Sequence, residues 1–444
     1  MPVRTGTAEV GRSLAILVLF LLLWGAMVPG SGVAGEEAKE TDPLRALVAE
    51  ALDRNPDLAS ARLSAEAAGH RVLPAGSLPD PMLSLSYMNL PVDDFAVDKE
   101  PMTSRDIGFA QAFPFPGKLS LKEEIARLGA AQAGDRAEAV RNLIRFRVAR
   151  DFFALIETRE VIRLTEKNKA FLSQLLAVAN ARYAVGKTPQ QDLFKVQVEI
   201  SRMENLLIAL RKREVALRAD LNTLRDRPVD APVDLPSSYP VPEILDREED
   251  LVGLALASNP DLKREADAVR QRETALRLAR KQILPDFQIG ATYRFRERSQ
   301  MGVDRPDFFS ANVMVSLPLW HGRKQDEEVE AAARDLSSRE SGYRDAINAV
   351  RNRIRDITAE IARLRASLTL FDSGLLPQAR ESVNSSLSAY RVGQVEFASV
   401  LLGQIELYRQ EIDREKTADA LGVAVAELEM VLGKELFGNE RMDR

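Results

Sequence analysis

The sequence contains an internal duplication. Four short motifs of the first half return in the same order in the second half, each 204 to 207 residues further along the chain. The pairs are Asn55-Pro56-Asp57-Leu58 with Asn259-Pro260-Asp261-Leu262, Leu78-Pro79-Asp80 with Leu284-Pro285-Asp286, Phe113-Pro114-Phe115 with Leu317-Pro318-Leu319, and Tyr183-Ala184-Val185-Gly186 with Tyr390-Arg391-Val392-Gly393. A duplicated sequence predicts two similar units related by pseudo-symmetry. We place the first repeat at residues 36–235 and the second at residues 236–444.

Residues 1–35 have the layout of a secretory signal peptide. Two arginines precede an apolar run at residues 14–28, and a stretch of small residues follows at 30–35. That order is typical of a charged region, an apolar core and a cleavage site. The alternative is a retained transmembrane anchor, but an apolar core of about 15 residues is short for a helix that needs roughly 20 to cross a bilayer. We therefore predict export, with cleavage near Ala34 or Gly35.

Composition excludes several classes of function. The net charge of −5, from 61 basic and 66 acidic residues, lacks the basic excess of a nucleic-acid-binding protein, so we predict no nucleic-acid partner. The chain has no cysteine for a disulfide, a thiolate ligand or a lipid anchor, and its two histidines, His70 and His321, lie in opposite repeats. Met82, Met88 and Met102 could bind soft cations, but we interpret them as lipid or packing contacts. We predict no catalytic residue, no cofactor and no metal site.

Long stretches of the chain lack proline. None occurs between Pro116 and Pro189, and Pro377 is the only proline after Pro318. Such runs allow helices of about 50 to 65 residues, which are roughly 75 to 100 Å long. The predicted helical hairpins span residues of about 119–226 and about 323–433.

Apolar residues in these hairpins recur at alternating steps of three and four. One series is Leu193, Val196, Ile200, Met203, Leu207 and Leu210, and another is Ile347, Val350, Ile354, Ile357, Ile361, Leu364 and Leu368. This period is typical of a coiled-coil seam. For these segments alone, a dimeric coiled-coil rod is an equally good interpretation.

Short segments between the helices alternate between apolar and polar residues with a period of two. The predicted strands span about 82–90, 105–113, 287–295 and 309–317. One apolar face and one mostly polar face are typical of a transmembrane barrel, and the residues predicted to face lipid are Leu83, Leu85, Tyr87, Ile107, Phe109, Ile289, Tyr293, Val313 and Val315. Four strands cannot close a barrel, so several identical chains must contribute. The alternative is a soluble amphipathic sheet that rests on the helices.

Together these features resemble the TolC-type outer-membrane factor family over about residues 44–433. Each motif is weak alone, but their order and duplication are specific. The resemblance implies a mainly α fold with membrane β: duplicated long coiled-coil hairpins and four strands, forming a homotrimer with a twelve-stranded barrel in outer-membrane lipid and an α-helical tunnel in the periplasm. It also implies a periplasmic adaptor (membrane fusion protein) and an inner-membrane RND-type pump as partners. The proline-rich strand borders look most like members that serve heavy-metal efflux.

In that family the Val-Gly turns lie at the periplasmic entrance, where the adaptor docks. The resemblance carries this role to Gly186, Pro189, Asp192, Gly393 and Glu396. Glycine suits such a turn because it tolerates positive φ, and we expect Thr188 to cap the returning helix with Pro189 as its first residue. Asp192 matches an acidic position at the entrance, but the equivalents in the second half are Ser399 and Leu402. Asp192 is equally well explained as a favourable charge in the first turn of a helix.

The predicted function is a passive outer-membrane duct, not an enzyme, for the export of small toxic solutes. Heavy-metal cations are one possible cargo. One alternative is a periplasmic adaptor, which should contain a single hairpin flanked by lipoyl-like β segments. The other is a structural coiled-coil protein of the envelope, which would explain the helices but not the alternating strands.

Overall fold

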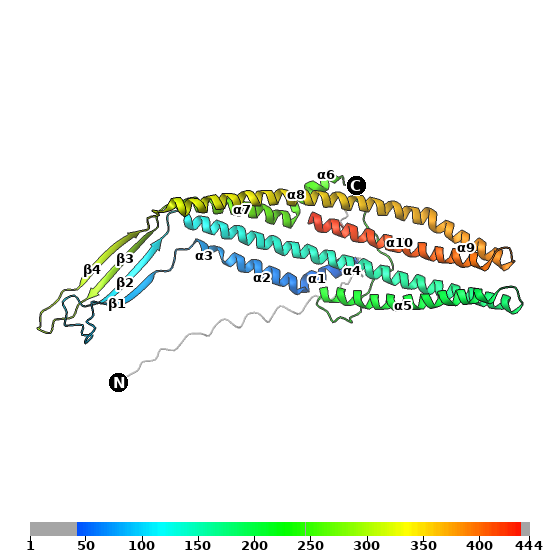
Figure 1. Cartoon of the computed structure of the whole chain (residues 1–444), viewed down its shortest axis with the longest axis horizontal. Coiled ribbons are helices and arrows are strands. Elements are labelled where there is room, and N and C mark those ends of the chain that lie inside the picture. Colours follow the sequence, from blue (N-terminus) through cyan, green and yellow to red (C-terminus); the bar gives the residue numbers. More distant parts are fainter. Residues whose placement is uncertain (1–41, 245, 437–444) are drawn as a thin grey trace, which may run out of the picture. The chain divides into compact units, whose positions relative to one another are not determined.

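The computed structural model describes residues 42–244 and 246–436, so the predicted signal peptide lies outside the described residues. The first half forms α1 (Pro43–Arg54), α2 (Pro56–His70), α3 (Val72–Gly76), β1 (Met82–Met88), β2 (Ser104–Phe113), α4 (Lys118–Ala184) and α5 (Gln190–Leu224). The second half forms α6 (Glu248–Ser258), α7 (Pro260–Lys281), β3 (Phe287–Phe295), β4 (Phe308–Val315), the 3-10 turn η1 (His321–Arg323), α8 (Gln325–Leu370), the π-helical turn η2 (Phe371–Leu375), α9 (Leu376–Arg391) and α10 (Phe397–Leu432). The two halves thus repeat one order of elements (Figure 1).

The duplicated Asn-Pro-Asp motifs join the start of one helix to the end of another. The side chain of Asn55 accepts a hydrogen bond from the backbone N–H of Leu58 at 3.2 Å, and its amide donates to the carbonyl of Leu224 at 2.9 Å. Asn259 accepts from the N–H of Leu262 and donates to the carbonyl of Val431, at 2.9 and 2.7 Å. A helix start and a helix end are therefore satisfied by a single buried side chain in each repeat.

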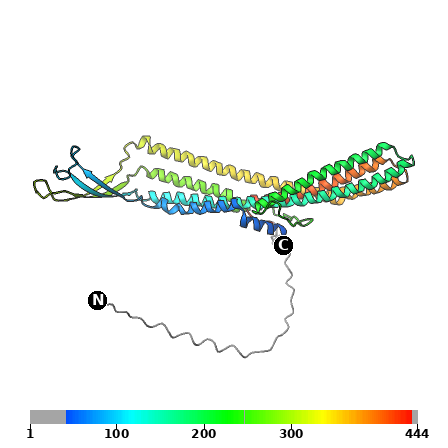
Figure 2. The same ribbon diagram turned by 90° about the horizontal axis from the view of Figure 1, so that it is seen from below.

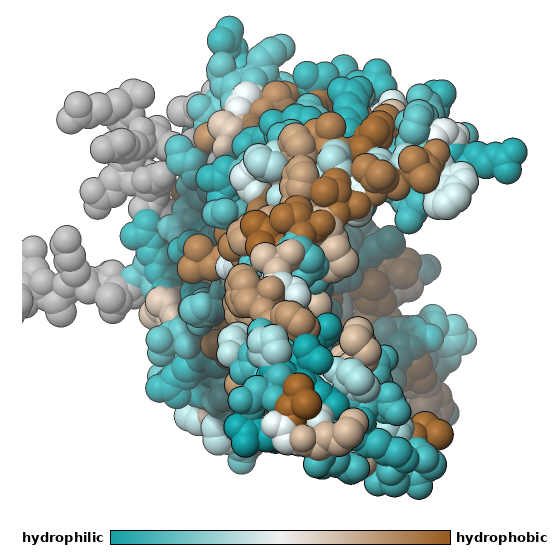
Figure 3. All heavy atoms as spheres, turned by 90° about the vertical axis from the view of Figure 1, so that its left-hand side faces the viewer, coloured by the Kyte–Doolittle hydropathy of each residue, from teal (hydrophilic) through white to brown (hydrophobic). Residues whose placement is uncertain are grey.

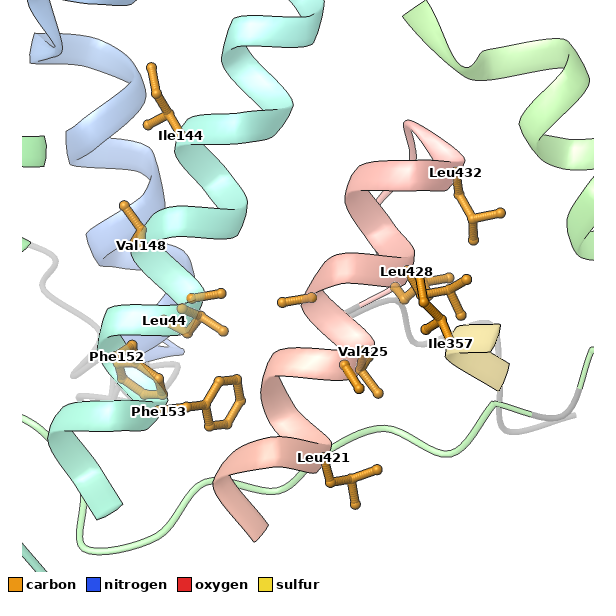
Figure 4. Packing of buried hydrophobic residues seen from close by; sticks show 14 of the residues in the cluster. Leu44, Ile144, Val148, Phe152, Phe153, Ile357, Leu421, Val425, Leu428 and Leu432 are labelled. Atoms are coloured by element: carbon orange, nitrogen blue, oxygen red, sulfur yellow. The ribbon is translucent and has the colours of Figure 1, made fainter. Parts of the chain in front are cut away.

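The main hydrophobic core surrounds the middle of α4. Figure 4 shows Phe153 of α4 on the side that faces α10, and Leu421 and Val425 on the side of α10 that faces away from α4; all three belong to one cluster of buried residues. The linker between the repeats crosses this core, where the ring of Tyr239 lies edge-on to Phe152 and Phe153. Both predicted coiled-coil series are buried or half-buried throughout. Within the described ranges, no helix combines the length and the apolar character that crossing a bilayer requires.

The second long hairpin is interrupted where the first is continuous. A π-helical turn over Phe371–Leu375 separates α8 from α9 and ends just before Pro377. Proline has no N–H to donate to the carbonyl four residues earlier, and its ring would clash with that carbonyl. A wider turn relieves both problems, so the helix continues past the proline instead of ending there.

The four strands form one antiparallel sheet in the order β1-β2-β3-β4. The β2–β3 pairing joins the two repeats, with Phe109 opposite Ala291. Figures 1 and 2 show the sheet at one end of the long helices and the hairpin turns at the other. Among the described residues, β1 and β4 each pair on one side only, so both edges of the sheet are open.

Candidate functional site

The first hairpin turn reverses the chain between α4 and α5. Gly186 has φ +70°, its N–H donates to the carbonyl of Tyr183, and the N–H of Lys187 donates to the carbonyl of Arg182, both at 2.9 Å. This pair of bonds is a Schellman motif, which requires the left-handed conformation at its glycine. A Cβ added at Gly186 would meet nothing within 4 Å. The positive φ of Gly186, and not a lack of room for a side chain, therefore explains why glycine occupies this position.

The second hairpin turn repeats this geometry. Gly393 has φ +83°, its N–H donates to the carbonyl of Tyr390 at 3.0 Å, and the N–H of Gln394 donates to that of Ala389 at 2.9 Å. Glu396 is exposed at the N-cap of α10. It therefore occupies the position that Pro189 occupies in the first turn, not the position of Asp192.

The expected start of α5 is wrong by one residue. Pro189, not Thr188, is the N-cap, with φ −73° and ψ 149°, and the helix begins at Gln190. The hydroxyl of Thr188 is buried 3.4 Å from that of Tyr390, so this side chain packs between the two hairpins and does not cap the helix. Proline tolerates the N-cap conformation because its own φ is fixed near this value.

Asp192 lies in the first turn of α5. Its side chain is only 12% exposed, and a carboxylate oxygen is 3.3 Å from Nζ of Lys195 one turn later. In the single chain, therefore, this carboxylate has a cation beside it and a favourable position at a helix N-terminus. The structure does not bring Asp192 and Glu396 into contact.

Arg182 and Tyr390 connect the tips of the two hairpins, and the sequence analysis did not predict this contact. Nη1 of Arg182 donates to the carbonyl of Tyr390 at 2.6 Å, and the guanidinium lies 4.6 Å from the centre of the tyrosine ring. The ring of Phe397 packs edge-on against the same tyrosine. Tyr390 is 2% exposed, whereas its counterpart in the first repeat, Tyr183, is 44% exposed. Phe397 was the one sequence signal for this contact, because the first repeat has Gln190 at the corresponding position.

The predicted lipid-facing residues all lie on one face of the sheet. The strand register places Leu83 opposite Phe109, Ile107 opposite Tyr293, and Ile289 opposite Val313. The nine side chains are exposed. Figure 3, which views the strand end of the molecule, shows hydrophobic side chains gathered on its surface. This placement supplies the one-sided apolar surface that contact with lipid requires.

The opposite face of the sheet is mostly polar. Two nitrogens of Arg294 donate to the carboxylate of Asp106 at 3.0 to 3.2 Å, and the hydroxyl of Ser104 donates to the same carboxylate at 2.7 Å. Met82 and Met88 lie on this polar face, opposite the residues that are predicted to face lipid. Residues of β1 alternate in direction, and even-numbered positions point away from the apolar face.

No cation site is evident among the residues that the structure describes. In that part of the chain, no group of three or more His, Cys, Asp or Glu side chains is arranged to hold a metal. His321 stands at the junction of β4 and α8, where its Nδ1 is 3.1 Å from the carboxylate of Asp326.

Comparison with known proteins assigns the family. The sequence profile described as "Outer membrane efflux protein" matches residues 47–225 and 251–434, one match in each repeat. This chain belongs to the outer membrane efflux protein family. It is therefore an outer-membrane efflux channel subunit, a member of a channel family and not of an enzyme family. The resemblance to TolC-type proteins is confirmed. The family match argues against the two alternatives, a periplasmic adaptor and a structural coiled-coil protein.

Individual relatives agree with this assignment. The cobalt-zinc-cadmium resistance protein CzcC of Cupriavidus metallidurans is 24% identical over 304 residues, which cover 67% of this chain and 69% of CzcC. Among solved structures, the outer membrane protein VceC of Vibrio cholerae has a TM-score of 0.76 at 17% identity, covering 88% of this chain and 96% of VceC. CusC has a TM-score of 0.74 at 16% identity, covering 88% and 92%. These two structures support the predicted fold of the chain.

Proposed function

We propose that three copies of this efflux protein form a twelve-stranded barrel in the outer membrane, continued by a helical tunnel in the periplasm. The open edges of β1 and β4 carry this proposal. In lipid, an unpaired strand edge leaves backbone groups unsatisfied at several kcal/mol each. A sheet with one exposed apolar face therefore becomes stable in the membrane only when further copies of the chain close it.

The barrel proposal assigns a role to each face of the sheet. Leu85, Ile107 and Val313 on the apolar face contact lipid, and the Asp106–Arg294 pair on the opposite face lines the channel. Because that pair joins opposite charges, it leaves the channel wall near neutral at this level. A passive duct for cations of several kinds needs no tight ligand set, which would slow their release.

The hairpin turns form the periplasmic entrance in this proposal. Val185 and Val392, next to the two glycines, are both exposed. An exposed apolar residue at the tip of each hairpin suits docking of the periplasmic adaptor, which in turn connects the duct to an inner-membrane RND-type pump. Gly186 and Gly393 fix the turns that present these side chains, and Asp192 and Glu396 supply the nearby negative charge.

Heavy-metal cations are the proposed cargo. The similarity to CzcC, a cobalt-zinc-cadmium resistance protein, supports this choice. The test is deletion of the gene in its own host, followed by growth on graded cobalt, zinc and cadmium salts and on a panel of drugs. We expect sensitivity to at least one of the three metals, restored by the intact gene. Sensitivity to drugs alone would contradict a metal duct but leave the family assignment untouched.

Val313→Arg tests the barrel itself. An arginine that faces lipid near the bilayer midplane should cost about 2 to 4 kcal/mol, so the heat-labile trimer band in outer-membrane fractions should be strongly reduced. Asn312→Arg is the matched control, since it places the same charge one residue away on the polar face. Equal assembly of the two variants would show that the apolar face does not meet lipid.

A further inference from the structure

We propose that the junction between β4 and α8, residues 316–324, binds anionic phospholipid headgroups at the periplasmic surface of the outer membrane. In this arrangement the ring of Trp320 lies at the level of the glycerol esters, and Arg323 and Lys324 contact phosphate oxygens. The inference rests on the proposed barrel and names the lipid that one part of its rim recognises.

The character of the side chains changes in a fixed order along this junction. Leu317, Leu319 and Trp320 come first and are 66%, 71% and 76% exposed. The exposed cations Arg323 and Lys324 follow, and three acids then occupy the first turn of α8, which leads away from the sheet (Figure 1). A chain that leaves a bilayer passes from hydrocarbon to phosphate to water, so this order of apolar, cationic and anionic groups fits that path.

The length of the apolar face of β4 places Trp320 near the membrane boundary. Phe309, Val313 and Val315 lie on that face, and the alternation continues to Leu317. From Phe309 to Leu317 the chain covers about 26 Å as a strand, or about 20 Å along the bilayer normal at a tilt of about 40°. The apolar band of an outer-membrane barrel is about 25 Å tall. Trp320 therefore follows where this band ends.

Trp320 is an addition that the first repeat does not contain. The offset between the repeats is 204 residues at Leu317 but 205 at Arg323, so one extra residue lies between them. At this place Pro116 of the first repeat is replaced by Trp320 and His321. Tryptophan combines a large apolar ring with one N–H donor and is enriched at membrane–water interfaces. The extra residue thus has the chemistry of the boundary at which it stands.

The cations of this junction are available to a ligand, unlike the cation of the first repeat. Lys118, the counterpart of Arg323, is 2% exposed, and its Nζ lies 2.9 Å from the carboxylate of Asp286. Arg323 and Lys324 form no ion pair within the part of the chain that the structure describes. A guanidinium and an ammonium side by side suit a phosphate, since the first donates two parallel hydrogen bonds and the second adds a point charge.

Lipid charge should matter because both cations lie next to the proposed headgroup level. Each Lys or Arg close to an anionic membrane surface raises affinity by about fivefold, and salt screens this attraction. A zwitterionic headgroup carries its own ammonium group, which opposes these cations. The junction therefore prefers an anionic phospholipid to a zwitterionic one.

The fluorescence of Trp320 tests its depth in the membrane. The second tryptophan of the sequence, Trp24, lies in the predicted signal peptide, so the mature chain carries its own single probe. The purified trimer is placed in phosphatidylcholine vesicles brominated near either the ester end or the methyl end of the acyl chains. We expect emission at shorter wavelength than in urea, and at least twofold stronger quenching from the ester end. Val313→Trp in a Trp320→Phe background is the deep control and should reverse the order.

Brominated headgroup classes test the charge preference. Vesicles contain equal parts of phosphatidylglycerol and phosphatidylcholine, with bromine on one or the other. At low salt, brominated phosphatidylglycerol should quench Trp320 at least threefold more effectively. The Arg323→Gln, Lys324→Gln variant should lower this ratio to near one. Arg334→Gln, Arg344→Gln is the matched control, because it removes the same charge from exposed positions about 15 Å or more further along α8.

Three results overturn the headgroup site. The first is emission from Trp320 as in urea without quenching by either lipid, and the second is equal quenching by the two headgroup classes. The third is a reduced trimer with unchanged lipid preference in the Arg323→Gln, Lys324→Gln variant, which would show that these cations contact protein. Quenching of Val313→Trp in the same vesicles would leave the barrel standing in all three cases. Absence of quenching at Val313→Trp overturns the proposed function as well.

Discussion

The two long hairpins follow one sequence plan, but their surroundings differ. In the first, α4 runs through 67 residues without a break, and α5 leaves one side exposed. In the second, a π-helical turn divides the outer helix, and α10 is buried against α4 on the corresponding side. Equivalent positions have therefore taken different residues, such as Val215 on α5 and Gly422 on α10.

In the proposed trimer, a second copy of the chain would cover the side of α5 that is exposed here. Gly422 lies so close to α4 that a Cβ there would be 2.5 Å from the ring of Phe153. Its exposed counterpart Val215 has no such neighbour within the chain. The hairpin tips also differ. Arg182 of the first repeat donates a hydrogen bond to Tyr390 of the second. The counterpart of Arg182 is Ala389, whose side chain can form no such bond with Tyr183.

The largest expected effect comes from closing the space at Gly422. Gly422→Ala places a Cβ against the buried ring of Phe153 and should destabilise the fold by about 2 to 3 kcal/mol, despite the better helix propensity of alanine. Thermal unfolding followed by circular dichroism in detergent measures the change. Gly403→Ala on the same helix is the control, because its Cβ would make ordinary contact at 3.5 Å with Val383. A stabilised Gly422→Ala variant would mean that α10 does not pack this closely on α4.

The second expected effect depends on pH and concerns Asp419 on α10. Burial and the negative charge of Glu157 raise the pKa of Asp419 to about 6, although Arg213 acts in the opposite direction. Its Oδ1 has no hydrogen-bond partner among the described residues. Because the folded chain binds this proton more tightly than the unfolded chain, whose carboxyl keeps its ordinary value of 3.8, stability falls as pH rises from about 4 to about 6.

Asp419→Asn removes this loss of stability. The variant should gain about 1 to 2 kcal/mol over wild type at pH 8 and little at pH 4, as measured by urea unfolding at both values. The counterpart on exposed α5 is Lys212, so the first repeat avoids the buried carboxylate altogether. Asp413→Asn, at a half-buried carboxylate near Arg409 and Lys416 on the same helix, is the comparison variant. An equal gain at both pH values would point to a packing effect and not to titration.

Local patterns predicted the elements, but not the contacts that make the repeats unequal. Period two placed the strand starts within one residue, and the proline-free runs placed the hairpins within two residues at each end. The role of Arg182 was not predictable from its repeat, because its counterpart is alanine and its partner lies 208 residues away. The π-helical turn before Pro377 depends on tertiary packing that keeps the helix going past a proline.

A third prediction concerns the contact between the hairpin tips. Arg182→Ala removes one hydrogen bond and one cation–π contact to Tyr390, which together are worth about 1 kcal/mol. Amide hydrogen exchange at the second turn should accelerate about fivefold, with no change in the core around Phe152. Arg391→Ala is the control, because that arginine is exposed at the end of α9. Unchanged exchange would show that the tips do not depend on each other.

The smallest change in stability is expected at the entrance, where the two hairpins carry different acids. Asp192 and Lys195 form a partly exposed pair on α5, so Asp192→Asn should cost less than about 0.5 kcal/mol. Its effect on transport should be larger than its effect on folding, since three copies would bring three such pairs to one constriction. Without the carboxylate, each Lys195 remains as an unpaired positive charge, and cation preference in planar-bilayer conductance should fall.

Lys195→Gln is the opposing variant, and it should raise cation preference by leaving Asp192 unpaired. Glu396→Gln compares the second hairpin, where an exposed carboxylate sits three residues earlier along its helix. A shift in selectivity for Asp192 and Lys195 but not for Glu396 would place the constriction at the first turn of α5. If none of the three variants changes selectivity, Asp192 acts only as a favourable charge at the start of a helix, because a charge that lines a narrow channel cannot be removed without altering ion preference.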